Sequence, residues 1–224
     1  MLTDDTTMND GQAATERPVA RSRRAEPLPP DERRRKIAEA VAPLLIERGA
    51  AVTTKELAER AGVAEGTLFS VFPDKRSLIE GAIAVHMDPA PLEADIAGID
   101  RDRDLVSQVA AAMHLISDRT DEVVALVVVL HTLVGHEPKP ADSGARSSML
   151  NWSETIRSAV TELLSEHPDE LRIPPDRVAA ALLGLVVAAR RPFAGQHDIL
   201  SVDEIVDVVL FGALKGAKGS ASCH

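Results

Sequence analysis

The segment AVTTKELAERAGVAEGTLFSVFPDKRSLI, residues 51–79, decides the fold, because it predicts two short helices joined by a glycine turn and followed by a third helix. Thr53 and Glu56 have the spacing of a capping box, so the first of these helices should begin at Thr54. The tripeptide Ala61-Gly62-Val63 supplies the turn, in which glycine tolerates a positive φ. This pattern predicts a helix-turn-helix.

The second helix of this segment should start near Ala64 and end at Pro73, because proline disfavours helical geometry in the residue before it. Asp74 is placed to cap a third helix, which opens with Lys75. A helix-turn-helix reads DNA with the first residues of its second helix in the major groove, and phosphate contacts fix its register.

Residues 66–75, GTLFSVFPDK, resemble the recognition segment of the TetR (tetracycline-repressor-like) transcriptional regulators, which typically reads G-T-[LI]-[YF]-x-x-F-x-x-K. The upstream family pattern T-x-x-E-[IL]-A is met from Thr53 to Ala58, so the resemblance covers about thirty residues. It implies an all-α fold with an N-terminal three-helix helix-turn-helix DNA-binding domain and a C-terminal helical ligand-binding and dimerisation domain.

The residues expected to bind DNA combine two sets, the groove side of the second helix and the positions that resemble the family's phosphate contacts. They are Thr54, Lys55, Glu65, Gly66, Thr67, Phe69, Ser70 and Lys75. Glu65 has two interpretations that stay open: it could accept a hydrogen bond from cytosine N4, or stabilise the helix dipole as a first-turn carboxylate.

Two positions depart from the family pattern. Val71 stands where family members often have Tyr or His, and it can donate no hydrogen bond to phosphate. Phe69 replaces the commoner Tyr and lacks its hydroxyl. We therefore expect weaker and more salt-sensitive binding by each reading head, with dimerisation supplying the remaining affinity.

The net charge of −10 is unevenly distributed along the 224 residues. Residues 17–76 carry 13 Lys and Arg against nine Asp and Glu, whereas residues 77–224 carry 12 against 22. Positive charge therefore lies with the helix-turn-helix, where phosphates would need it, and the acidic remainder favours docking by one end.

The chain divides into residues 1–30, an arm expected to be disordered; 31–88, the DNA-binding domain; and 89–224, the C-terminal domain. The arm could instead be a basic segment that enters the minor groove of DNA. Pro89 and Pro91 mark the expected boundary. Beyond it, apolar periodicity predicts helices at about 101–117, 119–135, 145–167, 175–190 and 202–216.

The last two predicted helices are the candidates for a homodimer interface. A stripe of small residues in the first permits close helix approach, and the second is apolar nearly all round, so it should be buried on two sides. The expected interface residues are Ala181, Leu182, Gly184, Leu185, Ala188, Ile205, Val209 and Ala213. An ordinary interior helix is the alternative.

The resemblance also implies an effector pocket inside the C-terminal helices, suited to a mostly apolar small molecule. Its candidate lining residues combine apolar bodies with a few polar handles: Met113, His114, His131, Met149, Trp152 and Ile156. Each could equally be an ordinary core residue.

Several other classes of protein are not indicated. The histidines His114, His131 and His136 lack the i, i+4 spacing of a metal face, and the chain has one cysteine, so we expect no metal and no cofactor. The sequence contains no phosphate loop, dinucleotide fingerprint or nucleophile elbow, so no motif indicates an enzyme. The polar N-terminus and the short apolar runs indicate a cytoplasmic protein without a membrane span.

Together these features predict a ligand-responsive transcriptional regulator, a repressor that binds a near-palindromic operator in double-stranded DNA as a homodimer. Two alternatives from other classes remain. One is a helical ligand-binding or protein-interaction dimer with weakened DNA binding, and the other is a small enzyme using a pair such as His131 and a carboxylate.

Overall fold

The computed structural model describes residues 28–134, 143–189 and 200–213, and within these ranges the chain is helical without strands. The elements in chain order are α1 (Pro30–Arg48), the 3₁₀ turn η1 (Gly49–Ala51), α2 (Thr54–Arg60), α3 (Glu65–Val71), α4 (Lys75–His86), α5 (Pro89–Ala97), α6 (Leu105–Val134), α7 (Ser143–Ser165), α8 (Pro175–Ala189) and α9 (Val202–Ala213). The all-α prediction is confirmed. Within the described ranges, no helix combines the length and apolar character that a bilayer span requires.

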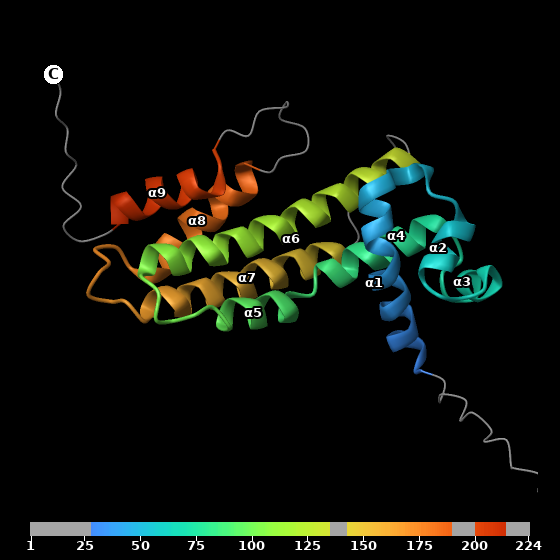
Figure 1. Ribbon diagram of the computed structural model, residues 1–224, viewed down its shortest axis with the longest axis horizontal. Coiled ribbons are helices and arrows are strands. Elements are labelled where there is room, and N and C mark those ends of the chain that lie inside the picture. Colours follow the sequence, from blue (N-terminus) through green and yellow to red (C-terminus); the bar gives the residue numbers. More distant parts are fainter. Residues whose placement is uncertain (1–27, 135–142, 190–199, 214–224) are drawn as a thin grey trace, which may run out of the picture.

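The helices form two groups at opposite ends of the molecule (Figure 1). Helices α1 to α4 gather at one end, with α2 and α3 outermost, while α8 and α9 lie at the other end beside the first half of α6. Helix α6 runs from one group to the other, so the predicted reading head and the predicted dimer helices are joined by a single long element.

Each group has its own apolar core, and α6 belongs to both. Leu126 and Val129, near the end of α6, are buried with the side chains of α1 to α4. Met113 and Ile116, earlier in the same helix, are buried in a second core with α5, α7, α8 and α9. The boundary expected after residue 88 stays a prediction: Asp88 is the N-cap of α5, and α6, which follows in the chain, contributes to both cores.

Pro89 and Pro91, which mark the expected boundary, open helix α5, an element not predicted from the sequence. Proline is favoured in the first turn of a helix, where its missing N–H would be unpaired anyway. The Asp88 side chain caps this turn by accepting from the Ala90 N–H at 3.1 Å. Leu92 and Ile96, one helical turn apart, are then buried in the C-terminal core.

The two helices predicted at 101–117 and 119–135 are one continuous helix, α6. The polar turn around Asp118 suggests a break, but a charged turn without Gly or Pro costs a helix little. Here it is stabilised by local contacts: Thr120 Oγ1 donates to the Ile116 carbonyl at 2.7 Å, and Arg119 lies 3.7 Å from Glu122. This continuity gives the molecule a stiff connection between its two cores.

Helix α4 is fixed against α3 by an unusually close approach at Gly81. A Cβ atom on this residue would lie 2.7 Å from Cε1 of Phe72, so a side chain here would force the buried Phe72 ring to shift. Phe72, which follows the last residue of α3, is 1% exposed and fills the space between α3 and α4. The end of the predicted recognition helix is thus anchored in the N-terminal core.

Candidate nucleic-acid interface

Helix α2 begins as predicted, with a complete capping box at its start. Glu56 accepts from the Thr53 N–H and from Thr53 Oγ1, both at 2.8 Å, and from Arg48 Nη1 at 2.7 Å. These hydrogen bonds, led by the one from the Thr53 backbone, lower the pKa of Glu56 to about 2. The network joins the end of α1 to the start of α2, and sequence spacing revealed Thr53 but not Arg48.

The depressed pKa of Glu56 predicts how acid affects stability. Because the folded-state pKa lies below the ordinary value of 4.5, the carboxylate contributes stability that is present above about pH 4.5 and is lost as the pH falls toward 2. Chemical denaturation between pH 2 and 5 should show this rise with pH in the wild type and a flatter profile in Glu56→Gln.

Glu59→Gln provides the matched control for this titration, since Glu59 is on the same helix and lies 4.0 Å from the exposed Lys55. It should keep the pH dependence of the wild type. An unchanged slope in Glu56→Gln would show that the capping network does not hold a charged carboxylate.

The turn between α2 and α3 has the predicted glycine geometry, and a side-chain clip joins its two helices. Gly62 has φ of 67°, a left-handed conformation that glycine adopts without strain. Thr54 Oγ1, at the start of α2, donates to Glu65 Oε1 at 2.5 Å. Glu65 occupies the first turn of α3, where a carboxylate is favoured by the helix dipole, and its hydrogen bond from cytosine N4 stays a prediction.

The predicted DNA-contacting residues fall into two groups by their availability. Lys55, Gly66 and Phe69 are exposed on the outer side of α2 and α3, and the Phe69 side chain is 43% exposed although it is aromatic. Ser70 is exposed too, but its hydroxyl donates to the Thr67 carbonyl at 2.7 Å. Thr54 and Glu65 are joined by a hydrogen bond, which occupies the Thr54 hydroxyl proton and one Glu65 oxygen.

Lys75 is used differently from the phosphate anchor that the sequence predicts. Its ammonium donates to the main-chain carbonyls of Ala50, at 2.7 Å, and of Val52. Ala50 is in the turn η1 and Val52 follows it, and a single three-donor cation satisfies both carbonyls. Burial lowers the pKa of Lys75. Two of its N–H bonds are thus taken up by the protein, and a phosphate contact by Lys75 stays a prediction.

The four cations at the start of α1 all have partners within the protein. Arg33 donates to the Leu28 carbonyl at 3.4 Å, Lys36 lies 3.1 Å from Glu32, and Arg35 lies 3.4 Å from Glu39. Arg34 reaches across to the end of α3, donating to the Val71 carbonyl at 2.8 Å. The periodicity of α1 did not indicate this last contact.

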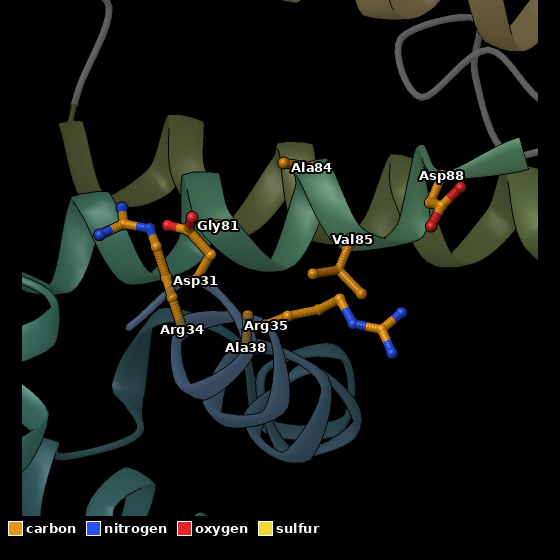
Figure 2. A pocket seen from close by; sticks show the side chains of 8 residues that line it. All are labelled: Asp31, Arg34, Arg35, Ala38, Gly81, Ala84, Val85 and Asp88. Atoms are coloured by element: carbon orange, nitrogen blue, oxygen red, sulfur yellow. The ribbon is translucent and has the colours of Figure 1, made fainter. Parts of the chain in front are cut away.

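An open groove of about 240 Å³ lies between α1 and α4, beside Arg34 and Arg35 (Figure 2). Its lining combines four small or apolar residues with two acidic and two basic ones: Ala38, Gly81, Ala84, Val85, Asp31, Asp88, Arg34 and Arg35. The opposite charges balance, so the groove does not attract phosphate as a cationic surface would.

The predicted dimer residues divide between the surface and the protomer's own core. Leu182 and Ile205 are buried within the C-terminal core, at 0% and 1% exposure, so the expectation that they meet a partner is wrong for these two. They occupy the inward sides of α8 and α9 because an amphipathic helix buries one stripe against its own domain. Exposed instead are Ala181, Gly184, Leu185 and Ala188 on α8, with Val209 half-buried on α9.

Two further apolar residues of α9, Val208 and Phe211, are 60% and 63% exposed. With the exposed apolar and small residues of α8 they make up a set that we call the α8–α9 face and define as Ala181, Gly184, Leu185, Val187, Ala188, Val208 and Phe211. The side chain of Ala213 lies outside the described residues.

The structure does not bring all six predicted pocket residues together. Met113, Trp152 and Ile156 share the C-terminal core, whereas Met149 is 61% exposed and His131 is also on the surface. His114 is exposed and lies 3.0 Å from Asp203, joining α6 to α9. His136, which was weighed as a metal ligand beside these two histidines, lies outside the described residues.

Buried polar atoms in the C-terminal half give a signal that the sequence alone did not. Within the described residues, four buried side-chain atoms have no hydrogen-bond partner: Arg101 Nη1, Gln108 Oε1, Ser117 Oγ and Trp152 Nε1. Such groups are costly in a folded protein unless something completes their hydrogen bonding. Gln108, also fully buried, uses its amide N–H groups to hold the turn before α6 through the carbonyls of Arg101 and Arg103.

Comparison with known proteins connects this geometry to a family. Residues 37–82, which span α1 to α4, match the model of the bacterial regulatory proteins of the tetR family. The nucleoid occlusion factor SlmA of Vibrio campbellii is 28% identical over 171 residues, covering 72% of this chain and 83% of that protein. The uncharacterized HTH-type transcriptional regulator YvkB of Bacillus subtilis is 42% identical over 53 residues, or 23% of this chain and 28% of the relative.

Solved structures share the whole fold at low sequence identity. A TetR transcriptional regulator from Streptomyces coelicolor superposes with a TM-score of 0.53 at 24% identity, covering 82% of this chain and 99% of that one. A TetR-family regulator from Mesorhizobium loti gives a TM-score of 0.57 at 15% identity, covering 83% and 96%. The chain therefore shares its fold with these proteins at low sequence identity.

Proposed function

We propose that this chain, which belongs to the tetR family of bacterial regulatory proteins and is a DNA-binding transcriptional regulator, is a homodimeric cytoplasmic repressor of a near-palindromic operator. The observation that carries the proposal is the exposed surface of α2 and α3, where Lys55, Gly66 and Phe69 face outward at the end of the molecule. Lys55 and Gly66 are the second residues of α2 and α3, two helices whose N-termini favour phosphate.

The homodimer would form through the α8–α9 face, which is apolar, exposed and distant from α3 (Figure 1). Small residues on α8 allow a partner helix to approach closely, and Phe211 would be the principal side chain buried. A two-fold axis there would place two reading heads on successive major grooves, roughly 34–36 Å apart. At this spacing both reading heads can contact the same DNA molecule, so the affinity of the dimer can be high although each head alone binds weakly.

The effector would be a mostly apolar small molecule that enters the C-terminal core near Trp152. Met113 and Ile156 supply apolar contact there, and the unpaired Trp152 Nε1 could donate to a carbonyl or hydroxyl oxygen of the ligand. None of these three residues is a cation that could pair with a carboxylate of the ligand. The proposal thus favours a neutral ligand with a hydrogen-bond acceptor.

Helix α6 would transmit the effect of this ligand to the DNA. Met113 and Leu126 lie in different cores of the same helix, about 20 Å apart at 1.5 Å per residue, and α4 packs on the second half of α6. A displacement of α6 would move α4 and with it α3. Only a ligand that binds the two head spacings with different affinity can shift DNA binding, and a hundredfold change requires about 2.7 kcal/mol.

The salt dependence of DNA binding tests the proposed function. Operator fragments are selected from random DNA by the purified protein, and their affinity is measured between roughly 50 and 300 mM salt. The log–log slope should be strongly negative in the wild type. In Lys55→Met it should become less negative by about 0.9 for each phosphate that the variant no longer neutralises.

Lys36→Met is the matched control, since it removes the same charge from α1, where Lys36 lies 3.1 Å from Glu32. It should leave the slope unchanged. A slope near zero in the wild type would contradict the proposal and favour the ligand-binding dimer with weakened DNA binding.

A further inference from the structure

We infer that Arg34 is a positioning residue for DNA recognition: from α1 it holds the C-terminal end of the recognition helix α3, without contacting DNA itself. The inference rests on the function proposed above and adds to it a residue outside the helix-turn-helix. It concerns how the reading head keeps its orientation.

The first contact of Arg34 is with the last residue of α3. Its Nη1 donates to the Val71 carbonyl at 2.8 Å, across 37 residues of sequence. The final carbonyls of a helix have no partner within the helix, and a cation there is favoured by the helix dipole. Helix α3 has seven residues, and so short a helix depends on contacts with its surroundings for its stability.

The second contact is with the next residue, Phe72. The guanidinium carbon of Arg34 lies 4.2 Å from the centroid of the Phe72 ring, a cation–π geometry. The edge of this ring meets Gly81 of α4, where a Cβ would be 2.7 Å from Cε1. Phe72 is therefore held between α1 and α4, and Arg34 binds two consecutive residues that end α3.

These contacts argue against the alternative that Arg34 neutralises a DNA phosphate. A planar guanidinium that stacks on a ring and donates to a carbonyl is committed to one orientation. Figure 2 shows Arg34 and its neighbour Arg35 with their guanidinium groups turned away from each other. Arg35 pairs with Glu39 on its own helix, and so provides a control of equal charge at the adjacent position.

Hydrogen exchange in the free protein tests the positioning directly. Arg34→Met keeps an unbranched apolar side chain but removes the donor and the charge. We expect the amides of residues 65–74 to exchange about fivefold faster or more than in the wild type, because the end of α3 opens more often. Arg35→Met should exchange like the wild type. Equal rates in both variants would overturn the inference.

DNA binding separates positioning from phosphate contact. In Arg34→Met, affinity for the selected operator should fall about tenfold, because each head lacks two stabilising contacts, while the slope against salt and the affinity for random DNA stay as in the wild type. Arg35→Met should remain within about twofold. A slope reduced by about 0.9 per phosphate would show that Arg34 touches DNA, and would overturn the inference.

Arg34→Lys asks whether charge alone is sufficient. Lysine keeps the charge but lacks the planar fork, so we expect only partial recovery of operator affinity. Complete recovery would overturn the inference that Arg34 acts through both its hydrogen bond to Val71 and its contact with the Phe72 ring. If the wild type selects no DNA, the proposed function fails, whereas the exchange comparison still decides whether Arg34 holds the end of α3.

Discussion

Replacement of Phe72 by alanine is expected to lower the free energy of unfolding by about 3–5 kcal/mol, the range for removing a large buried aromatic side chain. The ring is 1% exposed and fills the space between α3 and α4, and it also carries the Arg34 guanidinium on one face. The substitution would leave a cavity, and Gly81, which lies against the ring, has no side chain that could fill it. Such a decrease is a large part of the about 5–15 kcal/mol that stabilises a typical domain.

Phe69→Ala is the matched control, because it removes the same kind of ring from α3, three residues earlier in the chain. Phe69 is 43% exposed, so its removal should change stability by less than about 1 kcal/mol but should weaken operator binding. Denaturant unfolding followed by circular dichroism measures the first effect, and a binding titration the second. A decrease of less than about 1 kcal/mol in Phe72→Ala would contradict the packing described here.

The second large effect is expected on the α8–α9 face. The double variant Val208→Asp, Phe211→Asp places carboxylates where the proposed partner subunit would bury them, and desolvating unpaired charges is very costly. Since both side chains are about 60% exposed in the protomer, its own fold should be unaffected. Sedimentation should then report a single 23.9 kDa chain rather than twice that mass.

Disruption of the dimer should also weaken operator binding by about a hundredfold or more, because two linked heads gain affinity from effective concentration. Val128→Asp provides the control: Val128 is 40% exposed on α6, outside this face. It should remain dimeric. A double variant that stays dimeric would show that the subunits associate through another surface.

The sequence predicted the local structure of the reading head closely. The capping box at Thr53, the positive φ of Gly62 and the cap at Asp74 all appear where spacing placed them. Caps and tight turns depend on hydrogen bonds between residues two to four positions apart, so they can be predicted from short stretches of sequence. The same reasoning missed α5, because proline can either end a helix or begin one.

The uses of individual side chains were decided by tertiary structure. Lys75 has the position of a phosphate contact in the family pattern, yet its ammonium binds carbonyls 23 and 25 residues earlier in the chain. Arg34 is one of four consecutive cations, and its partner at the end of α3 is 37 residues away. Long flexible cations bind whichever acceptors the folded chain brings within reach, and periodicity does not reveal these acceptors.

By itself, then, the sequence determined that the chain is all-helical, that it carries a helix-turn-helix, and where those helices begin. Only the tertiary structure decided that α6 joins both cores without a break. It also decided that Leu182 and Ile205 are buried in the protomer's own core, and that Val208 and Phe211 lie on its surface. The physical reason is range: helix caps are local, whereas burial is a property of how distant helices pack against one another.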